Sequence, residues 1–408
     1  MHSSSSLARA SRRKSFRQAS GRCLAGHTGG GTFVLLRSLS RGILTSPLLN
    51  SPRPWKLAVA MFLGLGLPLE AGAGAPTFTF VTFDPPGSTA TTPSGITPDG
   101  LIIGYYTNAS GVQHGFMRTP DGTITTFDPP DSTLTTPTSI NPDGEIAGAY
   151  CDTAACVSSL VGARGFVRHR KGTFVTFAAP AGQILAPIFN VGGPPPDLTP
   201  AGAIAGSYAV FGPPFAEHGF VRHRNGTIKT IDLPGSTRTE VIAINPSGTI
   251  VGDYDTPAIL FAGFIRTPDE KVTTITLPGS CPGNTEPIGG INPAGEVAGV
   301  YSDSTCSGTH GYLRTPDGTI TTFDPPGSTA TTPSAINAAG AITGYFFPHG
   351  FVRHPSGTIV VFDPPGSTAT FPTEINDSGV IIGTYRDAKS VYHGFVRFRS
   401  EDDEDGER

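Results

Sequence analysis

The chain of 408 residues is poor in charge, sulfur and tryptophan. Charged residues make up only 15% of it, and it holds one Trp, three Met and five Cys. Low charge combined with a hydrophobic fraction of 37% opposes disorder, because apolar burial is available and charge repulsion is weak. The apolar run Leu57–Leu67 is too short to span a bilayer comfortably. We therefore expect a folded protein without a membrane span after this run.

Acidic residues are missing from the N-terminal region, where none occurs before Glu70 although ten Lys or Arg do. Lys56, the apolar run Leu57–Leu67 and the small residues Ala73–Ala75 have the order of a secretory signal peptide. The pattern predicts a leader over residues 1–75 that contributes nothing to the fold. "SRRKSF" at Ser11–Phe16 also resembles the twin-arginine export pattern, a mistaken upstream start codon would explain the long leader, and an organelle transit peptide is a further alternative.

Basic residues become scarce once the leader is set aside. Eighteen Lys or Arg then face thirty-one Asp or Glu, a net charge of about −13. This balance argues against binding to a phosphate backbone, so we expect no nucleic-acid partner. Residues 400–408, "SEDDEDGER", form an acidic tail that we interpret as disordered and solubilising.

Glycine and proline, at 53 and 39 residues, are abundant and recur at fixed places. The phrase "FDPPGSTATTPS" stands at Phe83–Ser94 and again, unchanged, at Phe323–Ser334, and "FDPPGSTATFPT" begins at Phe362. A marker Gly-Phe/Tyr-x-Arg occurs seven times at spacings of 39 to 54 residues. Recurrence at this period indicates a repeat architecture. The marker arginines are Arg118, Arg168, Arg222, Arg266, Arg314, Arg353 and Arg397.

Each repeat holds four short strand-like runs, which we call b (around "SAIN"), c ("EIAGAY"), d ("HGFVR") and a ("TITTFD"). Steps such as "NPDG" join b to c, and "PDG" or "RNG" join d to a, which is the chemistry of tight hairpins. Four strands in about 45 residues, repeated seven times, predict an all-β fold, a seven-bladed β-propeller of four-stranded blades over residues 76–399.

The connections predict the order of strands within a blade. The c–d links vary freely, whereas the a–b link is the nearly constant Pro-rich phrase, and a crossing between blades meets the same geometry every time. We therefore interpret the phrase as the strut between blades, held extended by Pro-Pro, and the blade order as b-c-d-a. A lone a-type run at Phe78–Asp84 is then expected to pair with the C-terminal runs of Thr373–Phe398 and to close the ring.

The stretch "EVIAINPSGTIVGDY", followed by "HGFVRHRNGTIKTIDLPG", resembles the HAF-type extracellular repeats of bacterial envelope and secreted proteins. The likeness covers roughly Phe78–Arg399. The family's His-Ala-Phe triplet is His-Gly-Phe in this chain, for example at His218. The resemblance implies an exported repeat protein and carries no established activity.

The eight histidines after the leader fall at two repeat positions. His218 and His223 are five residues apart on one strand, so they point to opposite faces and cannot chelate one ion together. We interpret the histidines as structural hydrogen-bonding groups and expect neither a metal site nor a cofactor. They are His114, His218, His310, His349 and His393 before the marker Gly, and His169, His223 and His354 after the Arg.

The marker Arg has two interpretations. It forms either a charged ring for an anionic ligand, or a structural tie to a carboxylate or to carbonyls within or between blades. Sevenfold repetition favours the structural role. The candidate carboxylates follow run a in five copies, at Asp84, Asp128, Asp232, Asp324 and Asp363.

Motifs of the common hydrolase, metalloprotease, phosphate-loop and EF-hand sites are absent from the sequence. We therefore expect a monomeric, secreted or envelope-located binding module for an extracellular protein or glycan, not an enzyme. The alternative is a propeller enzyme acting on carbohydrate, which would need a once-only cluster of Asp, Glu or His at the mouth of the channel. We expect the ligand on the face that carries the a–b and c–d loops, because sequence variety concentrates there.

Four cysteines follow the leader, an even number typical of an oxidising compartment. Cys281 lies in an a–b link and Cys306 in the c–d loop of the same blade, and both loops emerge on one face. Cys151 and Cys156 share a single c–d loop. The blade order therefore predicts the disulfides Cys281–Cys306 and Cys151–Cys156, the alternative being four thiols in a cytosolic protein.

Overall fold

The structure, a computed structural model, describes residues 79–159, 162–180, 197–210 and 216–398. All of them belong to one unit of the chain, Glu70–Arg408. The expected leader, most of the link Ala178–Asp197 and the acidic tail lie outside the described residues. Within the described part, no helix has the length and apolar character needed to cross a membrane.

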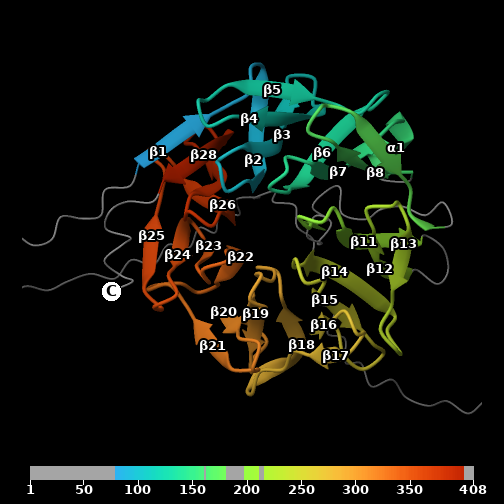
Figure 1. Cartoon of the computed structure of the whole chain (residues 1–408). Helices are drawn as coiled ribbons and strands as arrows, with labels where there is room; N and C mark the ends of the chain where they lie inside the picture. The colour runs from blue at the N-terminus through green and yellow to red at the C-terminus, as the bar shows by residue number, and fades with distance from the viewer. Residues whose placement is uncertain (1–78, 160–161, 181–196, 211–215, 399–408) are drawn as a thin grey trace, which may run out of the picture. The chain divides into compact units, whose positions relative to one another are not determined.

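Antiparallel strands follow one another in the expected order b-c-d-a (Figure 1). We call each set of four strands b, c, d and a a group. The first half of the chain holds β2 (Ser88–Ile96), β3 (Ile102–Asn108), β4 (Gln113–Arg118) and β5 (Ile124–Phe127); then β6 (Leu134–Ile140), β7 (Ile146–Cys151), β8 (Arg164–Arg168) and β9 (Phe174–Phe177); then β10 (Asp197–Leu198), β11 (Ile204–Val210), β12 (Ala216–Arg222) and β13 (Ile228–Ile231).

The second half repeats the pattern. It holds β14 (Arg238–Ile244), β15 (Ile250–Asp255), β16 (Ala262–Arg266) and β17 (Val272–Thr274); then β18 (Ser280–Glu286), β19 (Val297–Asp303), β20 (Thr309–Arg314) and β21 (Ile320–Phe323); then β22 (Thr332–Ile336), β23 (Ile342–Phe346), β24 (His349–Arg353) and β25 (Ile359–Phe362); and finally β26 (Ala369–Ile375), β27 (Ile381–Arg386) and β28 (Tyr392–Phe398).

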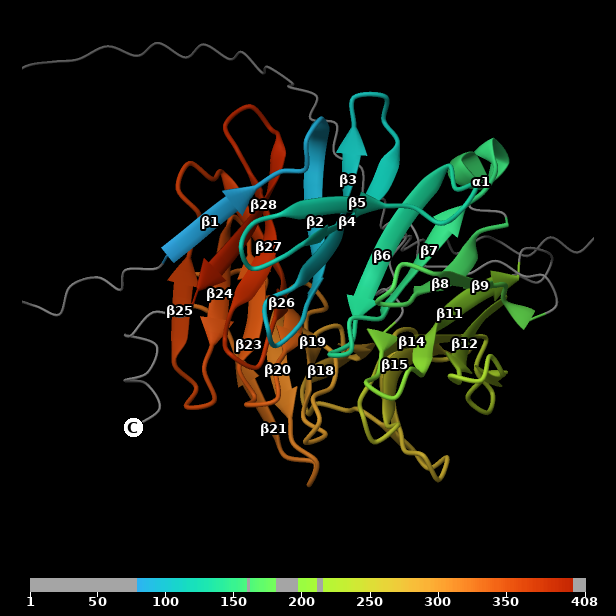
Figure 2. The same ribbon diagram turned by 45° about the horizontal axis from the view of Figure 1, so that its top comes forward.

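The N-terminal strand β1 (Thr79–Phe83) pairs with the C-terminal strand β28, as the sequence predicts. The pairing is antiparallel and runs from Thr79 opposite Phe398 to Phe83 opposite Gly394. Both views show β1 beside β28 (Figures 1 and 2). β1 thus supplies the fourth strand of the last group, beside β26, β27 and β28.

The repeated Pro-rich phrase is a connection only in its first part, which corrects the interpretation of the whole phrase as a strut. Asp84–Gly87 form a turn in which the Ser88 amide donates to the Pro85 carbonyl at 3.1 Å. From Ser88 onward the chain is strand β2, paired with β3. The physical reason is that Pro85 and Pro86 have no N–H to donate, whereas the following threonines are β-branched and suit a ladder.

The hydrophobic core lies between consecutive groups of strands. One cluster joins Val167 of β8 to Ile204 and Phe220 of the next group. The marker Phe explains the recurring Gly of run c: a Cβ on Gly148 would stand 2.6 Å from Cζ of the fully buried Phe166. Another cluster joins Phe83 of β1 and Val396 of β28 to residues of β2–β4, so the first and last described strands share one core.

Side-chain amides at the "IN" step link five of the seven groups to the next group. Asn376 shows the geometry: its Oδ1 accepts from the Val380 amide at 2.9 Å inside its own b–c turn, and its Nδ2 donates to the Thr97 carbonyl of the first group at 3.1 Å. In two groups this position is Thr97 or Thr199. Threonine has no side-chain amide, so it cannot donate the corresponding hydrogen bond to the following group. The other donors are Asn141 to Thr199, Asn245 to Asn292, Asn292 to Asn337 and Asn337 to Asn376.

Candidate functional site

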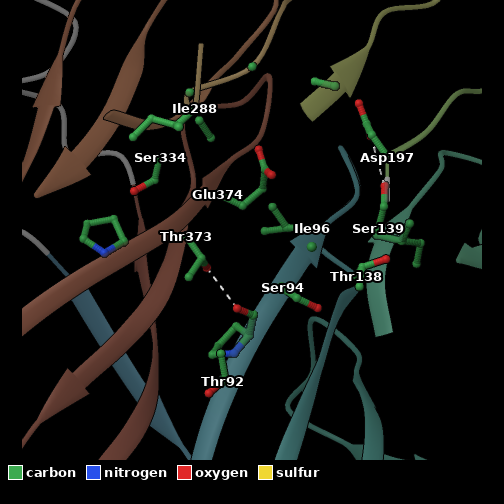
Figure 3. Close-up of a pocket in the computed structure, with 18 of the residues that line it drawn as sticks. Thr92, Ser94, Ile96, Thr138, Ser139, Asp197, Ile288, Ser334, Thr373 and Glu374 are labelled. Carbon is green, nitrogen blue, oxygen red and sulfur yellow. Dashed lines mark hydrogen bonds between the residues drawn. The ribbon is translucent and has the colours of Figure 1, made fainter. Parts of the chain in front are cut away.

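The b strands of the described groups surround a cavity of about 690 Å³ (Figure 3). This volume lies within the range of small-molecule sites. Its described lining combines hydroxyl side chains, such as Ser94 and Thr138, with the aromatic rings of Tyr105, Tyr345 and Phe371. Among these lining residues there is no Lys, Arg or His, so the cavity offers no basic side chain to an anion.

A β-bulge in run b points side chains into this cavity. The register with run c slips at Pro93 and at Pro137, as well as at Pro333 and Pro372 in later groups. It also slips at Val241, so the bulge does not depend on proline. The residue after each Pro carries a hydroxyl: Ser94 donates to the Pro137 carbonyl at 2.8 Å, and Thr373 donates to the Pro93 carbonyl at 3.0 Å (Figure 3). The bulges therefore tie neighbouring groups together around the cavity.

The residue before the last Ile or Leu of run b is small in most groups, and acidic in two. Asp197 and Glu374 are the exceptions, and both are half-buried and line the cavity. Figure 3 shows the two side chains on strands of different groups, with Asp197 hydrogen-bonded to Ser139. The small residues at this position are Gly95, Ser139, Ala243, Gly290 and Ala335.

The two carboxyl groups are in different electrostatic situations. Burial, with contributions from the charges of Asp197 and Asp377, raises the pKa of Glu374 to about 8, so this group keeps its proton at neutral pH. Burial also raises the pKa of Asp197, although the Leu198 amide at 2.8 Å, the Ile244 amide at 3.2 Å and the Ser139 hydroxyl at 3.2 Å oppose the change. Glu374 can therefore donate a hydrogen bond, and Asp197 accepts three.

The marker arginines pack between groups. Arg118 stacks on Phe83 of the preceding a-type strand, with 5.1 Å from its Cζ to the ring centroid, and its Nη1 donates to the Thr119 carbonyl. Arg266 is different, because the preceding strand carries Ile231 instead of Phe, and it pairs with Glu270. The same stacking joins Arg168 to Phe127, Arg222 to Phe177, Arg353 to Phe323 and Arg397 to Phe362; Arg314 donates to the Thr315 carbonyl.

The aspartates after run a pair with histidines, not with the marker arginines. Asp84 shows the full arrangement: one carboxylate oxygen is 2.6 Å from Nδ1 of His393, and the other accepts from the Thr91 hydroxyl at 2.5 Å. The Asp after run a and the His at the start of run d pair because they lie at the same end of adjacent strands. The other pairs are His114–Asp128, His218–Asp232, His310–Asp324 and His349–Asp363.

One polar cluster occurs only once in the described residues. Arg238, at the start of β14, lies within 4.0 Å of four carboxylates. Sequence reasoning did not single out this cluster or the pair Asp197 and Glu374. Aligning the repeats on the "IN" step would have found the pair, since acids replace small residues there. The four carboxylates are Glu217, Glu240, Asp253 and Asp255.

Both expected cysteine pairs stand at disulfide distance. Cys281 and Cys306 have Cα atoms 5.3 Å apart, and Cys151 and Cys156 have Cα atoms 5.5 Å apart. The loop of the second pair contains a helix that the sequence did not predict. This helix, α1 (Ala154–Ser159), turns the c–d loop back so that Cys156 lies beside Cys151 at the end of β7.

Replacing Cys281 and Cys306 by serine should lower the free energy of unfolding by about 3 kcal/mol, since the bond closes a loop of 25 residues in the unfolded chain. Chemical denaturation of the full chain under non-reducing conditions measures this. The matched pair Cys151→Ser/Cys156→Ser closes a loop of only 5 residues and should cost less. Equal stability of the Cys281→Ser/Cys306→Ser variant and the parent would contradict the pairing.

Comparison with known proteins identifies the fold. No family model and no curated protein matches the chain. Among solved structures, an oligogalacturonate lyase in complex with manganese matches with a TM-score of 0.52 and 11% identity over 80% of this chain and 97% of its own. A puromycin hydrolase matches at 0.51 and 14% identity (76% and 53% covered), and the acylaminoacyl peptidase of Pyrococcus horikoshii at 0.51 and 11% (76% and 52%). The chain thus spans about half the length of these two, and the likeness shows a fold of the β-propeller type.

Proposed function

We propose that the chain is an exported binding module in which seven four-stranded blades form a closed ring around the cavity. The relay of asparagine amides supports closure, because its last contact runs from Asn376 back to Thr97. The pairing of β1 with β28 and the core that these two strands share support it further. The two cysteine pairs support export. Membership of the HAF-type repeat family is a further proposal, and it rests on the resemblance of the repeat sequences alone.

The ligand that we propose is an uncharged, hydroxyl-rich molecule of about disaccharide size. The observation that carries this proposal is the lining of the cavity: hydroxyls, three aromatic rings, one acid that keeps its proton and no basic side chain among the described residues. Sugars offer hydroxyls to such groups and C–H faces to aromatic rings. An anionic sugar would meet Asp197 without a compensating cation.

Calorimetric titration of the full chain with a panel of neutral, cationic and anionic mono- and disaccharides tests the proposal. We expect a neutral sugar to bind and anionic ones not to bind. Ser334→Phe fills the cavity from a position whose side chain makes no hydrogen bond to another described residue, and should abolish binding. The control Asp143→Asn, on an exposed b–c turn, should leave the affinity unchanged. Preferential binding of the anionic sugars, or unchanged affinity in Ser334→Phe, would refute a site for a neutral ligand in the cavity.

A carbohydrate-cleaving enzyme is the second candidate, favoured by the raised pKa of Glu374. A carboxylic acid that holds its proton at neutral pH is the donor that glycosidic bond cleavage needs, and Asp197 would be its partner carboxyl group. Turnover of a sugar that binds in the cavity, lost in Glu374→Gln and retained in Asp143→Asn, would favour this function over binding alone.

A further inference from the structure

The two ends of the strands differ in charge. Strands within a group alternate in direction, so run b and run d start, and run c and run a end, on one side, which we call the loop face. Parallel bridges such as Glu217 opposite Arg238 bring the equivalent ends of neighbouring groups together. Among the described residues, the basic side chains of the loop face other than histidine are Arg164, Arg238, Arg386 and Lys389. Its acidic side chains are more numerous: Asp84, Asp128, Asp131, Asp152, Glu217, Asp232, Glu240, Asp253, Asp255, Glu286, Asp303, Asp324, Asp363 and Asp387.

The Arg238 cluster is the densest part of this negative charge. Arg238 can balance one of its four carboxylate neighbours, and Glu286 adds a further charge near Glu240 and Asp253. Burial and the charge of Glu217 raise the pKa of Glu240 to about 7. An additional cation near the cluster is therefore electrostatically favourable, because it reduces the repulsion between the carboxylates.

Three exposed apolar residues adjoin the cluster in the loop between β15 and β16. Ile259, Leu260 and Phe261 keep 39%, 57% and 40% of their surface exposed. Phe261 also packs on Arg238, with 5.0 Å from the guanidinium Cζ to the ring centroid. Consecutive exposed apolar side chains on a polar surface are typical of an interaction site.

The apolar loop is held in place by hydrogen bonds. The Phe261 amide donates to Oδ1 of Asp255 at 2.7 Å, and the Thr285 amide donates to the Phe261 carbonyl at 3.1 Å. Phe261 has a φ of 53°, a left-handed conformation that a residue with a side chain adopts only when its surroundings enforce it. The loop thus presents its apolar side chains without needing to be ordered on binding, which lowers the entropic cost of association.

We propose that this part of the loop face, Ile259–Phe261 with Glu217 and Asp255, docks a basic segment of a partner protein. An apolar side chain of the segment packs against Leu260, and its Lys or Arg side chains lie against Glu217 and Asp255. Charge complementarity selects this occupant, because the loop face has an excess of carboxylates around the apolar anchor. The docking surface is separate from the cavity, whose lining contains none of these residues.

Fluorescence anisotropy with a labelled short peptide of lysine, leucine and phenylalanine tests the docking surface on the full chain. We expect Leu260→Ser and Glu217→Gln each to weaken binding by about tenfold or more, as is typical of interface anchors. Phe347→Ser, at an exposed apolar position of another c–d loop, and Glu270→Gln, at a d–a turn, are the matched controls and should bind like the parent.

Binding should also strengthen as the pH rises from about 6 to about 8, because Glu240 loses its proton among Glu217, Asp253, Asp255, Glu286 and Arg238 and the cluster becomes more negative. Three results would overturn the proposal: full affinity in Leu260→Ser, equal binding of a peptide of lysine alone, or equal binding of a peptide with glutamate in place of lysine. Self-association of the chain that Leu260→Ser abolishes would instead assign the surface to a second copy, and would also overturn it.

Discussion

A chain that lacks Thr79–Asp84 is expected to lose several kcal/mol of stability, on the order of the whole margin of a domain. The deletion removes the five ladder pairs of β1 with β28 and exposes one edge of the last group. It also removes the buried ring of Phe83, on which Arg118 stacks, and the carboxylate of Asp84 that pairs with His393. Chemical denaturation of the parent and the deleted chain measures the difference.

Removal of the last six residues, 403–408, is the matched control for this deletion and should leave the unfolding midpoint unchanged. Equal midpoints for the parent and the chain without Thr79–Asp84 would mean that the groups of strands form an open array, because an open array does not depend on contact between its ends.

The protein is also expected to lose stability as the pH rises from about 4.5 to about 8. The pKa of Glu374 is raised from 4.5 to about 8 in the folded chain, so over this range the folded state holds a proton that the unfolded state has lost. The free energy of unfolding then falls by about 1.4 kcal/mol per pH unit for this group. Thermal unfolding across this pH range measures the slope.

Glu374→Gln should remove this part of the slope, since glutamine does not titrate, and Asp143→Asn should keep it. Other groups act in the same direction. The pKa of His393 is raised, because hydrogen bonds and charges of Asp84 and Asp387 outweigh the opposing effect of burial, so its stabilisation is lost as the pH rises through that raised pKa. An unchanged slope in Glu374→Gln would contradict a protonated Glu374 in the cavity.

The strand order could be predicted from the sequence because the turns are local features. Gly100 and Gly122 have φ values of 85° and 94°, in the b–c and d–a turns where the sequence places Asp-Gly. The cysteine pairs followed from the order, since it brings Cys281 and Cys306 to the same side of one group. Local chemistry therefore determined the course of the chain within each repeat.

The contacts between repeats could not be predicted in the same way. The sequence suggested Asp84 and its equivalents as partners of the marker Arg, but which of two polar residues meets an Asp depends on where neighbouring strands end. The c–d loops differ in length and sequence from repeat to repeat, so comparing the repeats gave no indication of α1 in the loop after Cys151. Asp197 and Glu374 went unrecognised because only an alignment of the repeats shows that they replace small residues at one position.

We propose that β1 and β28, the first and last described strands, close the ring around the cavity by pairing with each other. Thr79 and Phe398 stand directly opposite each other in the pairing of β1 with β28 and are both exposed, so Thr79→Cys/Phe398→Cys should form a disulfide across the closure. Non-reducing peptide mapping of this variant is the most direct test. The closed ring predicts a cross-link between the peptides that carry positions 79 and 398, besides Cys151–Cys156 and Cys281–Cys306. Two alkylatable thiols at positions 79 and 398, with both native pairs intact, would contradict it.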